Sequence, residues 1–149
     1  MLKKWEELPD FMQCEEIRAY YDVLSKKRAA LVCKRVFDVL AAAVLLVLLA
    51  IPMGVIALLI KLDSPGPVFF RQERVTTYGK TFRIHKFRTM VNHADKMGTA
   101  VTVGGDSRIT KIGAKLRSCR LDELPQVLDV LAGDMSFVGT RPEATKYVA

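Results

Sequence analysis

The longest apolar stretch of the chain is Val39–Ile60, which holds 22 residues without a charged side chain. As one straight helix it would be about 33 Å long, enough to cross a hydrocarbon core of about 30 Å. Pro52, followed by Gly54, lies inside this run. A proline removes one backbone hydrogen bond and clashes with the carbonyl four residues earlier, so we expect a kink near Leu48–Pro52. The run therefore predicts a bent, membrane-inserted helix.

The charges around this run bear on how the helix sits in a membrane. Basic residues precede it and follow it, so the positive-inside rule does not choose an orientation. A bent helix that enters and leaves by the same face satisfies both flanks. A tilted, kinked helix that spans the bilayer is the alternative. The basic residues concerned are Lys26, Lys27, Arg28, Lys34 and Arg35 before the run, and Lys61, Arg71 and Arg74 after it.

Upstream of the run, apolar side chains recur at roughly helical spacing between Cys14 and Leu31, with lysine and arginine among them. This pattern predicts an amphipathic helix that lies at the membrane interface. A soluble N-terminal helix that packs on the rest of the domain is the alternative.

Downstream of the run, the pattern changes to that of strands and turns. Asp63–Pro67 is a dense turn signal that ends the long helix. Val68–Val75 and Thr81–Phe87 are rich in β-branched and aromatic residues, and the short segment Thr76–Lys80 separates them. These features predict a β-hairpin. Residues 92–105 are interpreted as a loop or a short helix followed by a glycine-rich turn.

Two further helices are predicted toward the C-terminus. One runs from Asp106 through about Arg117. The other follows Leu121, with Pro125 in its first turn and Gly133 just after its C-terminus, positions that suit these two residue types. Four leucines of this second segment, at positions 121, 124, 128 and 131, fall on one helical face.

Composition and charge narrow the class of partner. A chain of 149 residues accommodates one domain. Residues 1–25 carry a net charge of −3 and the remainder +10, which together make +7. Such a basic region favours nucleic acid, anionic lipid headgroups or phosphorylated substrates, and the apolar run favours the last two. Because no nucleic-acid-binding motif is present, we expect no nucleic-acid partner.

Cysteine and histidine residues do not predict a metal site. The three cysteines, Cys14, Cys33 and Cys119, are too few and too scattered for a disulfide framework or a zinc site. The two histidines, His85 and His93, have no partner at metal-ligand spacing and are interpreted as polar surface residues.

The candidate chemistry lies at Asp122 and Glu123, just before a predicted helix N-terminus, where ionised carboxylates and bound anions are favoured. A phosphoryl-transfer site must position phosphates and neutralise their charge, and a carboxylate can supply the nucleophile. A hard divalent cation takes one or two carboxylates plus substrate phosphates. By itself, such an acidic pair is more often a helix cap. The arginines that could accompany it are Arg88, Arg108, Arg117, Arg120 and Arg141.

Five linked motifs carry a resemblance to a known family. In this order and spacing they resemble the bacterial sugar transferase family, the monotopic polyprenyl-phosphate phosphoglycosyl transferases, over about residues 34–148. Three departures stand out: Thr140 replaces a usual proline, Asp129 replaces a common asparagine, and family members usually continue for some tens of residues beyond Ala149. The motifs are Lys61–Gln72 (KLDSPGPVFFRQ), Lys86–Met90 (KFRTM), Leu121–Gln126 (LDELPQ), Gly133–Gly139 (GDMSFVG) and Arg141–Glu143 (RPE).

The resemblance implies a role for each matching residue. Asp122 attacks the β-phosphate of a UDP-sugar, releases UMP and becomes a phosphosugar–aspartyl intermediate. Glu123 assists by deprotonating the lipid phosphate that attacks this intermediate. Mg²⁺ is the implied cofactor, with Asp122 as its protein ligand. Lys86, Arg88 and Arg141 are the implied substrate phosphate-binding residues.

The resemblance also implies an architecture and a location. The expected fold is α+β: an N-terminal amphipathic, interfacial segment (1–33), a re-entrant membrane helix (34–62) and a small cytoplasmic α/β catalytic region (63–149) with a short β-hairpin and amphipathic interfacial helices. That region is expected to be C-terminally truncated relative to the family. Undecaprenyl phosphate is the expected acceptor, membrane lipid surrounds the helix, and the catalytic part lies on the cytoplasmic face of the bacterial inner membrane.

The implied product starts a surface glycan, such as an exopolysaccharide, a capsule or a glycoconjugate. The alternative is a catalytically inactive, membrane-anchored binding or regulatory module of the same fold, which the short C-terminus motivates. The sequence does not distinguish among sugars, and a homo-oligomer is compatible with it.

Overall fold

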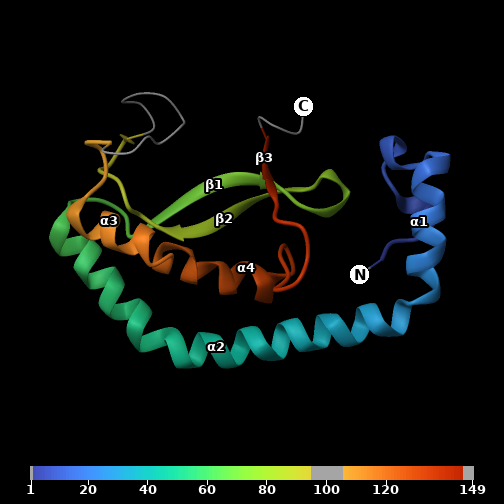
Figure 1. Ribbon diagram of the computed structural model, residues 1–149, viewed down its shortest axis with the longest axis horizontal. Coiled ribbons are helices and arrows are strands. Elements are labelled where there is room, and N and C mark those ends of the chain that lie inside the picture. The colour runs from blue at the N-terminus through green and yellow to red at the C-terminus, as the bar shows by residue number, and fades with distance from the viewer. Residues whose placement is uncertain (1, 95–105, 146–149) are drawn as a thin grey trace.

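The computed structural model describes residues 2–94 and 106–145. It contains one long apolar helix, several shorter helices and a small antiparallel sheet, which confirms the predicted α+β class. Figure 1 shows three layers: the sheet, then helix α4 (Val127–Ala132), then the long helix α2 (Arg28–Asp63) beneath both.

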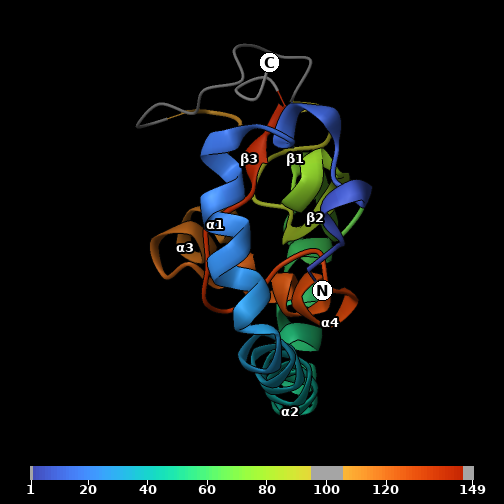
Figure 2. The ribbon, with the colours of Figure 1, turned by 90° about the vertical axis from the view of Figure 1, so that its right-hand side faces the viewer.

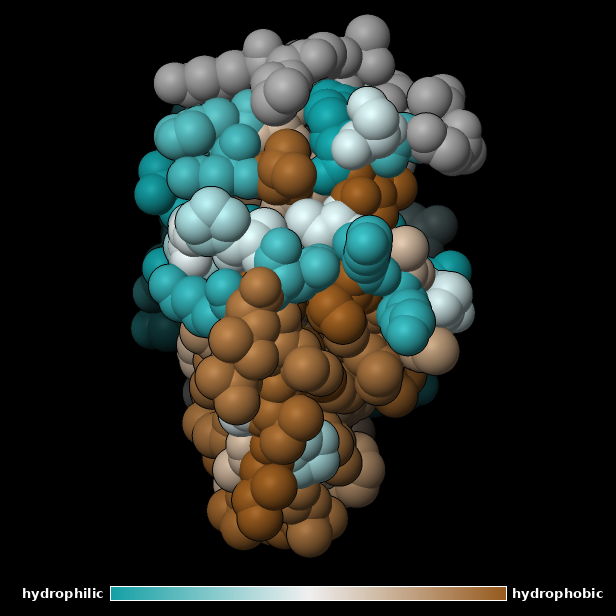
Figure 3. Space-filling view, turned by 90° about the vertical axis from the view of Figure 1, so that its left-hand side faces the viewer, coloured by the Kyte–Doolittle hydropathy of each residue, from teal (hydrophilic) through white to brown (hydrophobic). Residues whose placement is uncertain are grey.

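Helix α2 is 36 residues long and contains Pro52. Among the described residues it is the one helix that is long and apolar enough to cross a membrane, by length and composition. Figure 1 shows that it bends in its middle, so that both of its ends rise toward the sheet, as a proline in the helix predicts. Many of its large apolar side chains are exposed, among them Val47, Leu48 and Ile51. Figure 3 shows that the lower part of the molecule, where α2 lies, is hydrophobic.

Each arm of α2 packs against the domain through its own apolar cluster. In the C-terminal arm, Ile56 and Ile60 pack with the buried side chains of Phe87 and Leu116. The N-terminal arm contributes the second cluster, which consists of Ala42, Val127 and Val130. The bent helix therefore supports the domain from two sides.

Polar residues that precede the apolar run fasten the N-terminal arm of α2 to α4. The Arg35 guanidinium donates to the carbonyl oxygens of Val130 and Leu131, at 2.7 and 2.9 Å, near the C-terminal end of α4. The carboxylate of Asp38, which is buried, accepts a hydrogen bond from the hydroxyl of Ser136 at 2.7 Å. These contacts hold α4 and the segment that follows it against the part of α2 that precedes the apolar run.

The predicted hairpin is confirmed. Strand β1 (Phe69–Val75) pairs antiparallel with strand β2 (Thr81–Phe87), and a 3-10 turn at Thr77–Gly79 joins them. A third strand, β3 (Glu143–Ala144), pairs with the other edge of β1, which gives the order β2-β1-β3. This strand was not predicted, because two residues are too few to show the alternation of a strand.

The N-terminal helix is observed as α1 (Glu15–Lys26), after two short 3-10 turns at Trp5–Glu7 and Asp10–Met12. In Figure 2, where α2 is seen nearly end-on, α1 rises from the N-terminal end of α2 to the level of the sheet. Its predicted place at a membrane interface stays a prediction.

Helix α3 (Lys111–Ser118) begins five residues later than predicted. The hydroxyl of Thr110 accepts the Gly113 amide at 3.0 Å and caps the helix. Before it, Ile109 forms a β-bridge with Met90. The chain at 106–109 therefore pairs with another segment instead of coiling. Most of the loop with a glycine-rich turn predicted for 92–105 lies outside the described residues.

Candidate active site

Asp122 and Glu123 lie in a 3-10 turn, Leu121–Gln126, that leads directly into α4. Pro125 of this turn is buried, which anchors the turn in the fold and leaves both carboxylates partly exposed. The predicted position of the acidic pair ahead of a helix is therefore confirmed, with the 3-10 turn in place of the first helical turn.

Two cations from distant segments bind Glu123. The Lys86 ammonium, on β2, lies 3.1 Å from Glu123 Oε1, and the Arg141 guanidinium donates to the same oxygen. Burial alone would raise the pKa of Glu123, but the hydrogen bonds and charges of Arg141 and Lys86 outweigh burial and hold this pKa below its usual range. Glu123 is thus kept ionised, and its charge is balanced.

Asp122 faces a pocket of about 450 Å³, whose lining also includes Lys86, Arg88 and Arg117. Burial raises the pKa of the Asp122 carboxyl; the charge of Lys86 opposes this rise, and the neighbouring charge of Glu123 adds to it. The two adjacent acids therefore differ in their surroundings. Glu123 is bound by two cations, whereas Asp122 borders the open pocket.

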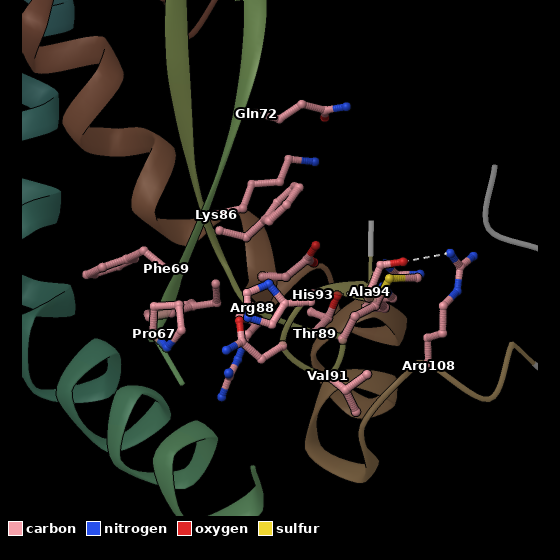
Figure 4. A pocket seen from close by; sticks show the side chains of 16 residues that line it. Pro67, Phe69, Gln72, Lys86, Arg88, Thr89, Val91, His93, Ala94 and Arg108 are labelled. Atoms are coloured by element: carbon pink, nitrogen blue, oxygen red, sulfur yellow. Dashed lines mark hydrogen bonds between the residues drawn. The ribbon is translucent and has the colours of Figure 1, made fainter. Parts of the chain in front are cut away.

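Arg88 lines the same pocket (Figure 4), but its guanidinium binds the turn that follows α2. It donates to the Pro65 carbonyl at 2.7 Å, and to the Ser64 carbonyl and hydroxyl at 2.7 and 2.9 Å. A Cβ on Gly66 would lie 2.1 Å from this guanidinium, so the turn requires glycine there. Of the three predicted phosphate-binding cations, Lys86 and Arg141 lie at the acidic pair. The guanidinium of Arg88 instead contacts the segment that follows α2. Their roles toward phosphate stay predictions.

The structure adds Arg117 of α3 to the pocket. Its Nε donates to the Thr89 hydroxyl at 2.8 Å, which fixes the guanidinium at the pocket wall. The sequence places Arg117 among several arginines, and no local signal separates it from Arg120. A third arginine of the lining, Arg108, donates to the Ala94 carbonyl at 3.0 Å, the contact dashed in Figure 4.

The interpretation of His85 as a polar surface residue is wrong. Its Nδ1 lies 2.6 Å from one oxygen of Asp129, and its backbone amide donates to the other oxygen at 2.9 Å. Asp129 is only 2% exposed. This buried carboxylate therefore ties α4 to β2 at the residue next to Lys86.

Among the described residues, the acidic pair is what the protein offers a metal ion at this site. In the part of the chain that the structure describes, no three side chains of His, Cys, Asp or Glu lie together as a metal-binding group. Mg²⁺ is usually held by one or two carboxylates together with substrate phosphates. Because Glu123 is already bound by two cations, Asp122 is the carboxylate that suits this arrangement. The donor set fits Mg²⁺, and the cofactor stays a prediction.

Comparison with known proteins identifies the family. A family model described as bacterial sugar transferase matches residues 29–149. The chain is 51% identical over 114 residues to the UDP-glucose:undecaprenyl-phosphate glucose-1-phosphate transferase of Caulobacter vibrioides. The aligned region covers 76% of this chain and 43% of that protein. The chain is 46% identical over 115 residues to the UDP-N-acetylgalactosamine-undecaprenyl-phosphate N-acetylgalactosaminephosphotransferase of Aeromonas hydrophila, with 77% and 27% covered.

A third relative, the exopolysaccharide production protein PSS of Rhizobium leguminosarum, is 50% identical over 115 residues, with 76% of this chain and 58% of that protein covered. The chain thus spans between about a quarter and three fifths of the length of these relatives. The matched region includes α2 except its first residue, the sheet and every residue of the candidate site. The chain belongs to the bacterial sugar transferase family.

Proposed function

We propose that the protein is a phosphoglycosyl transferase that moves a sugar 1-phosphate from a UDP-sugar to undecaprenyl phosphate and so starts a surface glycan. The observation that carries this proposal is that the two adjacent carboxylates have different surroundings. Glu123 is held ionised by Lys86 and Arg141, while Asp122 borders the pocket. The names of the relatives, which state transfer of a sugar phosphate to undecaprenyl phosphate, support the same reaction.

In the first half of the reaction, a carboxylate oxygen of Asp122 attacks the β-phosphorus of the donor. The bond from that phosphorus to the oxygen that bridges to the α-phosphate breaks, and UMP leaves with the electron pair. A phosphosugar–aspartyl ester remains on the protein. Lys86 and Arg141 lie where they can neutralise charge that develops on the phosphoryl oxygens.

In the second half, a phosphate oxygen of undecaprenyl phosphate attacks the same phosphorus. The aspartyl P–O bond breaks, which restores the Asp122 carboxylate and leaves a lipid-linked diphosphate sugar. Glu123 accepts the proton of the incoming phosphate. Mg²⁺, when bound at Asp122 with the substrate phosphates, supplies further charge neutralisation.

We further propose that α2 is re-entrant and that the domain lies on the cytoplasmic face of the inner membrane. Both ends of the bent helix rise toward the domain, and the exposed apolar surface is gathered below it (Figures 1 and 3). Single cysteines placed before Val36 and after Ile60, in a chain without its native cysteines, should react with impermeant reagents from the same side. Reaction from opposite sides would establish a spanning helix instead.

The reaction is tested with the Asp122→Asn variant. An amide cannot act as the nucleophile, so the variant should release no UMP from any UDP-sugar and form no phosphosugar adduct detectable by mass spectrometry. Asp10→Asn, at an exposed N-terminal position, is the matched control and should keep both. Retained adduct in Asp122→Asn would show that another residue is the nucleophile. A folded wild-type chain that releases no UMP with Mg²⁺ and a full panel of UDP-sugars would favour the inactive module.

A further inference from the structure

Phe69 has an unusual position for an aromatic residue next to a charged site. It begins β1 and lines the pocket that also contains Asp122 and Lys86. Its ring stacks on the ring of Phe87, with centroids 5.5 Å apart and an interplanar angle of 14°. Nevertheless, 41% of its surface is exposed. The ring is therefore packed on Phe87 and lies edge-on to the ring of His85, with centroids 6.5 Å apart, and its exposed surface lies at the edge of the pocket.

This aromatic stack continues into the membrane helix. Phe87 is fully buried and packs against Ile56 and Ile60 of α2. The same arm of α2 carries large exposed apolar side chains, including Leu58 and Leu62, which are 60% and 75% exposed. Phe69 is thus one ring away from the helix whose apolar surface suits lipid.

The pocket has an apolar side and a cationic side. In Figure 4, Phe69 projects from the strands toward α2, whereas Lys86 and Gln72 project the opposite way. This division follows from the strand geometry, because neighbouring side chains alternate between the two faces of a sheet. On the cationic side, the Lys86 ammonium contacts Glu123. An amphiphile with a phosphate headgroup and an apolar tail fits both sides at once.

We propose that Phe69 binds the first isoprene units of the lipid acceptor and so guides its phosphate from the membrane to Asp122; this inference rests on the proposed function. The acceptor must bring its phosphate to a partly buried carboxylate while its tail stays out of water. Each methylene group left in water weakens binding about fourfold. An exposed aromatic surface between α2 and the pocket removes part of that penalty where the tail leaves the bilayer.

The two half-reactions allow a test. Exchange of labelled UMP into the UDP-sugar needs only the donor and Asp122, whereas transfer to lipid needs the acceptor as well. We compare Phe69→Gln, which places a polar group at the pocket edge, with Phe69→Leu, which keeps an apolar side chain. Phe11→Ala is the control, because Phe11 is exposed, lies in the N-terminal segment and does not line the pocket.

Phe69→Gln should exchange UMP at the wild-type rate with an unchanged KM for the donor, while its KM for undecaprenyl phosphate rises about tenfold. Phe69→Leu should stay within about threefold of wild type, and Phe11→Ala should be unchanged. Geranyl phosphate, a short water-soluble acceptor that carries the first isoprene units, should show the same loss with Phe69→Gln. UMP exchange also shows that a variant is folded. If Phe69→Gln does not exchange UMP, the same measurements are made on Phe69→Ala instead.

Three results would overturn the inference. An unchanged acceptor KM in Phe69→Gln would show that the ring does not contact the lipid. A raised donor KM would mean that Phe69 stacks on the nucleotide base. A loss confined to undecaprenyl phosphate, with geranyl phosphate unaffected, would indicate general membrane anchoring. If the wild-type chain exchanges no UMP at all, the proposed function itself fails, which is a separate outcome.

Discussion

The close approach of α3 to Thr89, two residues after β2, makes Gly113→Ala the most informative single substitution. A Cβ at Gly113 would lie 2.0 Å from the Thr89 carbonyl oxygen and 2.6 Å from its carbonyl carbon. Ordinary van der Waals contact begins near 3.4 Å, so α3 and the segment that follows β2 would have to separate by about 1.4 Å. The colliding atoms belong to the backbone, and no rotamer change can relieve the clash.

The size of the effect follows from two opposing terms. Overpacking a well-packed site costs about 1–3 kcal/mol, and a backbone clash belongs at the upper end of that range. Replacing glycine by alanine within a helix returns up to about 1 kcal/mol. We therefore expect Gly113→Ala to lower the free energy of unfolding by about 2 kcal/mol, which corresponds to a Tm about 4–8 °C lower for a chain of this size.

Gly54→Ala is the matched control. Gly54 is also helical, in α2, and nothing lies within 4 Å of the position that a Cβ would take there, so this variant should keep or slightly raise the Tm. Thermal unfolding of both variants in the same detergent checks the prediction. UMP release should fall in Gly113→Ala alone, because α3 carries Arg117 at the pocket wall. Equal Tm values for the two variants would refute the packing argument.

Four further predictions concern charged residues. Asp122 attacks as the carboxylate and Lys86 lowers its pKa, so Lys86→Met should move the acid limb of the pH profile for UMP release to higher pH. Glu123→Gln should move it to lower pH, because the charge of Glu123 raises the pKa of Asp122; shifts in the opposite directions would contradict the assignment. Arg35→Met should lower the stability by about 1–3 kcal/mol, measured as a lower Tm, since two α4 carbonyls lose a hydrogen bond from the guanidinium. Arg88→Lys should also lower the Tm, because an ammonium cannot replace a planar guanidinium across the turn; activity lost at an unchanged Tm would instead indicate contact with substrate.

The elements that the sequence predicts well are those that depend on spacing along the chain. The uncharged run Val39–Ile60 lies within one helix, the turn residues after it end that helix at Asp63, and the two β-rich segments pair as a hairpin. Gly133 adopts a left-handed conformation at φ 97° after α4, as its place in the pattern predicts. Each of these features is determined by residues within a few positions of one another, so the local pattern contains the necessary information.

The tertiary structure alone decided which polar groups meet. Glu123 is 37 residues from Lys86 and 18 from Arg141, and His85 is 44 residues from Asp129. Such partners depend on how the helices and the sheet pack, and spacing along the chain does not encode that packing. For this reason the sequence could name an acidic pair and a set of candidate cations, whereas only the fold assigned Lys86 and Arg141 to Glu123 and turned Arg88 toward the segment after α2.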